Sequence, residues 1–279
     1  MKGMKETKGT KEGPFSLRSR PGTSGVRTRA WSRLGARLVF LVALLGGNLA
    51  CLCSLPPPGI WQKTVGGTDG VGGETYEIEG VTGVTMACIG TLHIEQGGEE
   101  RLYVEAEANL LPYFEIEVED GALDIATRPG VELSPGKPVD FYLVVGELES
   151  LLLAGDGAVE ASGLEVDELW VIVSGSGDVE MEDLEADGLT VVVAGSGDLR
   201  VSGQVDEQVV TVSGPGTYRA HDLQSAQARV RVSGDGSATV RVSQRLDVEV
   251  SGDGSLRYAG SPTVEETVTG SGSVERIGD

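Results

Sequence analysis

The chain has 279 residues, of which 42 are glycine and only 13 are aromatic (four Phe, six Tyr and three Trp). Residues 1–37 hold ten Lys or Arg and two Glu, a net of +8; the remainder holds 12 basic and 41 acidic residues, a net of −29. A body this acidic repels nucleic acid and anionic lipid headgroups, so direct binding to either is not expected. The scarcity of aromatic residues predicts a core of Val, Leu and Ile.

An uncharged apolar run, residues 38–55, follows the basic segment 1–37. A basic flank, an apolar stretch and then small residues are typical of an export signal. A run of 18 residues is also just long enough to span a bilayer as an uncleaved anchor. In either case the positive-inside rule places residues 1–37 in the cytoplasm and the body outside it.

The stretch that ends at Cys51 resembles a bacterial lipobox, in which the cysteine is lipidated and becomes the mature N-terminus. Asn48 stands where that pattern prefers Leu. Three interpretations of 38–55 are therefore open: a lipoprotein signal with Cys51 as the lipidation site, an uncleaved membrane helix, and an ordinary cleaved signal. Because 1–37 is long for the basic part of a signal, a mis-assigned start codon is also open.

The segment 56–75 is rich in Pro, Gly and Thr, which predicts a tether to a folded domain at 76–279. In the first part of this domain apolar residues alternate with polar ones between glycines, which is typical of strands and turns. These apolar positions are Leu92, Ile94, Leu102, Val104, Ile116, Val118, Leu123 and Ile125. A single helical turn is expected at 110–112.

From about residue 150 a Gly-x-Gly motif recurs at intervals of 18–20 residues. Its first glycines are Gly155, Gly175, Gly195, Gly214, Gly234, Gly252 and Gly270. Seven copies in near-constant register are strong evidence of a repeat architecture. One 20-residue coil cannot offset its own conformational entropy, so the coils must stack.

The residues around each motif predict a strand with one buried face. The position two residues before the first glycine is apolar in every coil: Leu153, Val173, Val193, Val212, Val232, Val250 and Val268. The position four residues after it begins a second strand with Val159, Val179, Leu199, Tyr218, Ala238, Leu256 and Val274. Glycine at the corner between them is expected to take a positive φ. In the last coil Glu265 and Glu266 replace apolar residues, which predicts a polar end.

Three segments carry a resemblance to a known family. They are Gly90–Gly97 (GTLHIEQG), Leu102–Leu111 (LYVEAEANLL) and Val118–Ile125 (VEDGALDI), followed by Ser-Gly-Ser-Gly-Asp corners. Together these resemble the putative auto-transporter adhesin, head GIN domain family over about 200 residues. The resemblance implies an all-β fold, a right-handed parallel β-helix or β-solenoid with about 18–20 residues per coil. It also implies an adhesive role without an established ligand.

The candidate chemistry is sparse. The corner aspartates form two columns, Asp178 with Asp198 and Asp235 with Asp253, which either are solvated turns or bind calcium through their carboxylates. His93 and His221 have no expected catalytic partner, and Cys88 is expected to be a small buried residue. Arg229, Arg231, Arg241 and Arg245 are expected on a solvated face of mixed charge.

The sequence therefore predicts an exported, membrane-anchored surface module that acts in adhesion or binding and has no catalytic site or cofactor, calcium excepted. Its expected partners are a glycan or a protein, the membrane through the N-terminal anchor, and a second copy through self-association. The alternative is a carbohydrate-active enzyme on a similar β-helix, which would need acidic and basic residues in one cleft.

Overall fold

The computed structural model describes residues 63–68 and 70–278, which lie in one compact unit. The strands are β1 (Lys63–Gly66), β2 (Val71–Glu77), β3 (Gly83–Ala87), β4 (Thr91–Gln96), β5 (Arg101–Glu107), β6 (Phe114–Glu119), β7 (Ala122–Thr127), β8 (Val131–Ser134), β9 (Asp140–Val145), β10 (Ser150–Leu153), β11 (Ala158–Ser162), β12 (Glu165–Val173), β13 (Asp178–Val193), β14 (Asp198–Val212), β15 (Thr217–Gly234), β16 (Ser237–Gly252), β17 (Ser255–Ala259), β18 (Thr263–Gly270) and β19 (Ser273–Gly278). The one helical turn among them is the 3₁₀ turn at Leu111–Tyr113, as expected.

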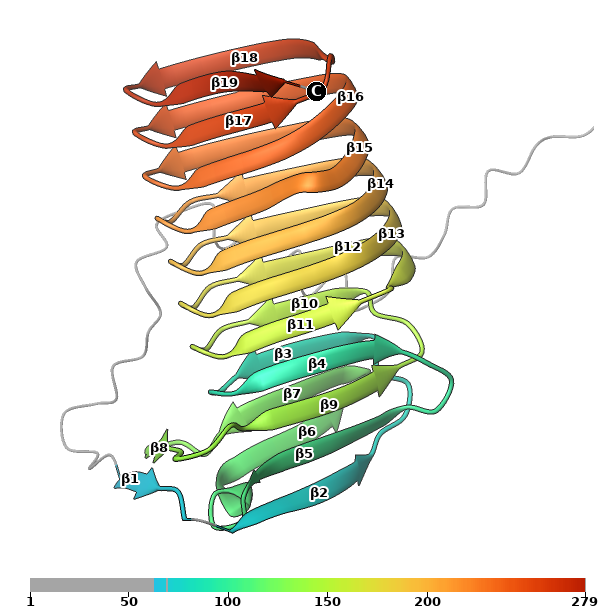
Figure 1. Ribbon diagram of the computed structural model, residues 1–279, viewed down its shortest axis with the longest axis vertical. Helices are drawn as coiled ribbons and strands as arrows, with labels where there is room; N and C mark the ends of the chain where they lie inside the picture. Colours follow the sequence, from blue (N-terminus) through green and yellow to red (C-terminus); the bar gives the residue numbers. More distant parts are fainter. Residues whose placement is uncertain (1–62, 69, 279) are drawn as a thin grey trace, which may run out of the picture. The chain divides into compact units, whose positions relative to one another are not determined.

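The strands stack in two layers that face each other across the core (Figure 1). The back layer consists of β6, β7, β3, β10, β12, the second halves of β13 to β16, and β18. The front layer consists of β2, β5, β9, β4, β11, the first halves of β13 to β16, β17 and β19. The Gly-x-Gly corners join the layers along one edge, and wide bends join them along the other.

The register of the parallel ladders confirms the predicted coil length. Leu153 pairs with Val173 and Val173 with Val193, offsets of 20 residues. The next three offsets along the same column, through Val212 and Val232 to Val250, are 19, 20 and 18. The all-β solenoid predicted from the repeat is therefore correct.

Both predicted apolar columns line the core. The column that runs from Leu153 to Val250 is fully buried, as is the column from Val159 to Leu256. The last coil described departs from this, because none of the described coils packs on its outer side: Val268 is 42% exposed. The core is aliphatic, and Cys88 is buried in it, where burial raises the pKa of its thiol to about 12.

The reason for glycine at the corners differs from the expectation in four of the seven coils. Gly234, Gly252 and Gly270 do have positive φ, at 107°, 106° and 114°. The four earlier first glycines do not. There a side chain is excluded by close approach: a Cβ on Gly175 would collide with the carbonyl oxygen of Gly155 in the preceding coil. The stacking of backbone on backbone therefore requires glycine even where φ is ordinary.

Two features of the chain path differ from the prediction. Strand β1 lies within 56–75 and β2 begins there, so the folded region begins before residue 76. Strand β1 pairs with β8 and β2 with β5. Between corners the chain forms one continuous bent strand, such as β13, in place of two separate strands. The bend is accommodated by register shifts in the ladder and by a positive φ of 54° at Asp183.

A polar network lies inside the core of the fourth and fifth coils. The Tyr218 hydroxyl donates to Gln208 Oε1 (3.1 Å), and Gln208 Nε2 donates to Ser225 Oγ (2.8 Å). Ser225 Oγ in turn donates to the carbonyl of Arg241 (2.8 Å). Gln208 and Tyr218 are both fully buried. The network gives each of its three buried side chains a hydrogen-bond partner, as low-dielectric interiors require.

Candidate functional site

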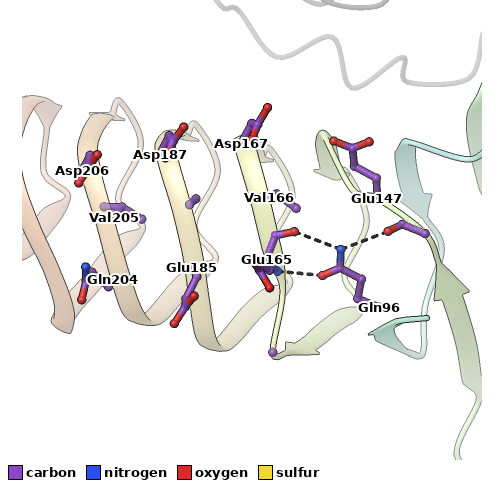
Figure 2. Close-up of a pocket in the computed structure, with 13 residues that line it drawn as sticks. Gln96, Glu147, Glu165, Val166, Asp167, Glu185, Asp187, Gln204, Val205 and Asp206 are labelled. Carbon is purple, nitrogen blue, oxygen red and sulfur yellow. Dashed lines mark hydrogen bonds between the residues drawn. The ribbon is translucent and has the colours of Figure 1, made fainter. Parts of the chain in front are cut away.

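A hollow lies along the wide bends, opposite the glycine corners. It is a groove of about 760 Å³ that crosses consecutive coils. Its acidic lining residues are Glu147, Glu165, Asp167, Glu185, Asp187 and Asp206, with Gln96 and Gln204 between them. Figure 2 shows the side chains of Asp167, Asp187 and Asp206 in one row and those of Glu165, Glu185 and Gln204 in a second. We call this surface the acidic groove.

The register of the coils produces these rows. Glu165 pairs with Glu185 and Glu185 with Gln204, so the second row follows the ladder directly. Val166, Ala186 and Val205, which alternate with the two rows, pack toward the core. Each carboxylate therefore points outward and repeats at the strand spacing of about 4.8 Å.

Gln96 fixes one end of the groove. Its Nε2 donates to the carbonyls of Gly146 and Glu165, both at 3.1 Å, and its Oε1 accepts from the amide of Glu165 at 2.8 Å. The side chain thereby joins β4, the β9–β10 loop and β12 (Figure 2). The first acidic residues are held on a rigid frame.

The crowding of carboxylates affects a neighbouring residue. Burial raises the pKa of the Glu168 carboxyl above its ordinary value, and the charges of Asp187, Glu207 and Asp167 raise it further. Gly188 on the next coil leaves room for the Glu168 carboxylate, because a Cβ there would overlap it. This edge of the solenoid therefore favours positive charge in its neighbourhood.

The corner aspartates predicted as calcium ligands have protein partners in three of four cases. Asp178 Oδ1 accepts from the amide of Asp198 at 3.0 Å, and Asp198 Oδ2 pairs with Arg219 at 2.6 Å. Asp253 accepts from the hydroxyl of Ser271 at 2.7 Å. Over the described residues no group of three or more His, Cys, Asp or Glu side chains has the geometry to hold a metal ion. Asp178 and Asp253 instead each receive a hydrogen bond from the next coil.

His93 has partners that the sequence did not predict. Its Nε2 lies 3.3 Å from Asp140 Oδ1 and its Nδ1 lies 3.2 Å from Glu160 Oε2. Its ring also stacks on Tyr142 with centroids 4.9 Å apart. Tyr142, His93 and Glu160 share one in-register column across β9, β4 and β11, so their grouping follows from stacking. Asp140 lies two residues before Tyr142 on β9 and pairs with Thr91. The other histidine, His221, contacts Arg241 at 3.3 Å.

The four grouped arginines separate in the structure. Arg229, Arg231 and Arg245 lie on the back layer, where Arg231 pairs with Glu249 at 2.7 Å and Arg245 with Asp247 and Glu265 at 2.8 and 3.0 Å. Arg241 lies in the first half of β16, beside His221. The predicted face of mixed charge is confirmed for the first three.

Other positions predicted from the sequence lie outside the described residues. Cys51 and the whole segment 38–55 belong to this group. Within residues 63–68 and 70–278 no helix is long and apolar enough to cross a membrane.

A stacked β-solenoid with open, repeating surface columns is the class of protein that this geometry defines. Among solved structures it is similar to a putative adhesin from Bacteroides fragilis (22% identity, TM-score 0.73), covering 76% of this chain and all of that one. It is also similar to a putative lipid binding protein from Parabacteroides distasonis (24% identity, TM-score 0.66; 77% of this chain, all of that one). A putative adhesin from the same species is similar as well (24%, TM-score 0.61, with the same coverage).

Residues 82–262 match the model of the family described as putative auto-transporter adhesin, head GIN domain. The match covers more than half of the chain, and the chain belongs to this family. No curated protein matches the sequence. The resemblance inferred from the three opening segments and the corners is therefore confirmed.

Proposed function

We propose that the chain is an exported, cell-surface adhesion module that binds its partner in the acidic groove without catalysis. The partner class that fits this groove best is an extended, basic segment of a surface or matrix protein. The observation that carries the proposal is the row of Asp167, Asp187 and Asp206, one carboxylate per coil, whose neighbours on both sides pair in register.

The geometry supports an extended partner. Strand residues in a bound segment repeat at about 3.3 Å and the carboxylates at about 4.8 Å, so lysine or arginine side chains of a straight segment can reach successive coils. The acidic body adds long-range attraction, which speeds encounter with a cationic partner. Such an interaction weakens as salt rises.

The sequence and the family together support export. The basic segment 1–37, the apolar run 38–55 and Cys51 together favour a lipoprotein anchor, and an adhesin must lie outside the cytoplasm. Metabolic labelling with a fatty-acid analogue tests the anchor. Wild-type chain should be labelled and Cys51→Ala should not; equal labelling of both, or of neither, would rule out lipidation at Cys51.

The catalytic alternative has less support. A carbohydrate-active site needs an acid beside a basic residue in one cleft, whereas the residues that line the acidic groove include no Lys, Arg or His. The arginines of the back layer are instead paired with carboxylates.

The test is a binding screen with full-length chain against immobilised matrix proteins, basic peptides and glycans. The triple variant Asp167→Asn, Asp187→Asn, Asp206→Asn should lose binding to the hit. A charge-matched control carries Glu105→Gln, Glu160→Gln and Glu180→Gln on the front layer and should retain it. A hit that is a neutral glycan, bound equally by all three proteins, would contradict the acidic groove as the site.

A further inference from the structure

The outer surface of the back layer carries an apolar patch. Its residues are Leu152, Trp170, Ile172, Val192 and Val209, which we call the back patch. Leu152, Ile172 and Val192 form one in-register column on consecutive coils. Trp170 and Val209 lie in the adjacent outward column, with Thr190 between them. The patch therefore spans four coils.

These side chains lie on the solvent side of the layer. They alternate with the inward residues Val171, Val191 and Val210. Four of the five are half-buried, and Ile172, between them, is 4% exposed. Their strands read WVIV, TVVV and VVTV, with apolar residues on both faces. Continuous apolar runs are typical of sheets that are covered on both sides. An apolar sheet face of this kind marks an interaction surface.

Charges of opposite sign lie at the two ends of the patch. The column of Ile172 continues, one coil at a time, through Val192 and Thr211 to Arg231. In the opposite direction the column continues from Leu152, one strand at a time, through Thr85 and Asp124 to Glu117. The adjacent column has the same polarity: Arg229 stands at the first end and Glu119 at the second.

We propose that the back patch is a homodimer interface, in which two copies pack face to face with their solenoid axes antiparallel. The two-fold axis runs along the strands, between β10 and β12. This places Ile172 of each copy over the partner's Leu152. Three steps from there, about 17 Å from the axis, Arg231 meets the partner's Glu117. By the same operation Arg229 meets the partner's Glu119.

Side-chain size is also complementary under this symmetry. The bulky Trp170 faces the partner's Ser150, and Val209 faces the partner's Ala122. Thr190 faces the partner's Gly83. Each large residue of the column thus meets a small one, as close packing of two sheets requires.

Charge selects this arrangement over the alternatives. A two-fold axis parallel to the solenoid axis would place each coil over the same coil of the second copy. Arg231 of one copy would then lie against Arg231 of the other. A lipid surface offers no counterpart to the acidic end at Glu117 and Glu119. Arg231 keeps its Glu249 partner in the chain, at 2.7 Å, and its remaining guanidinium N–H groups are sufficient for a second carboxylate.

The experiment measures the mass of the full chain by sedimentation velocity over a range of concentrations. Wild type should dimerise, and Val192→Lys should raise the dissociation constant by at least about tenfold. Ser162→Lys, on the exposed front layer, adds the same charge and should leave the constant unchanged. Circular dichroism melts confirm that each variant is folded.

A charge swap tests the antiparallel geometry. Arg231→Glu and Glu117→Arg should each weaken the dimer, and the double variant should restore it to within about threefold of wild type. Monomeric wild type at every concentration, or a double variant no tighter than the singles, would overturn the proposal. Flotation of a monomeric wild type with phosphatidylcholine vesicles, lost in Val192→Lys, would assign the patch to lipid and equally overturn it.

Discussion

The buried network around Gln208 allows a quantitative test of how the solenoid core tolerates polar side chains. The column that contains Gln208 holds Leu169, Leu189 and Leu246 on other coils, so leucine fits its backbone environment. Gln208→Leu removes the acceptor of the Tyr218 hydroxyl and leaves that hydroxyl buried without a partner. Tyr218→Phe removes the donor and leaves Gln208 Oε1 unpaired.

The magnitudes follow from the contacts. A buried, unsatisfied polar group costs about 1–3 kcal/mol, and each lost hydrogen bond about 1 kcal/mol. We expect Gln208→Leu to lower the free energy of unfolding by about 2–3 kcal/mol and Tyr218→Phe by about 1–2 kcal/mol. The double variant removes both unpaired groups, so its cost should fall below the sum by about 1 kcal/mol.

Urea denaturation followed by circular dichroism measures this cycle. Gln224→Leu, at an exposed position on the next coil, is the matched control and should change stability by less than about 0.5 kcal/mol. If the two single effects simply add to within about 0.3 kcal/mol, the hydrogen bond between Tyr218 and Gln208 does not hold in solution.

Three further predictions concern individual residues or pairs of residues. Val212→Asp should unfold the solenoid because it buries an unpaired charge, whereas Thr211→Asp, one residue outward, should cost less than about 0.5 kcal/mol; equal melting temperatures would refute the strand phase. Glu168→Gln should raise Tm by about 1–2 °C at pH 7. Since the raised pKa means that the folded state disfavours the charged form, this gain should vanish at acid pH, where Glu168 is protonated in both states; a gain independent of pH would contradict it. Calcium should raise Tm beyond the effect of sodium at matched ionic strength only if the Asp178 and Asp198 column binds it, and substitution of both by Ser tests that.

The repeat made the core predictable. Each inward column lies at a fixed distance from the Gly-x-Gly corner, so Val212 and Tyr218 could be placed in the core from spacing alone. The same fixed spacing holds for the acidic groove, because Asp167, Asp187 and Asp206 each stand eight residues before a first glycine. The groove lies at the edge opposite the glycine corners, where the sequence has no comparable turn motif to mark it.

Other features could not be read from one sequence. Alternation predicts strands but not their direction, so the antiparallel pairs β2–β5 and β6–β7 at the N-terminal end were not foreseen. Gln208 interrupts an apolar column, and its partners lie 10 and 17 residues away, both in β15. His93 acquires its carboxylates only through stacking of β9, β4 and β11, whose registers depend on the whole fold.

The central claim, that the acidic groove binds a cationic segment, is tested most directly by the affinity of the full chain for an oligolysine peptide at two salt concentrations. Wild type and the control with Glu105, Glu160 and Glu180 changed to Gln should bind alike, and both should weaken as salt rises. The variant with Asp167, Asp187 and Asp206 changed to Asn should bind at least about tenfold more weakly at low salt. Equal losses in the two triple variants would show that net charge alone attracts the peptide and would contradict a site in the groove.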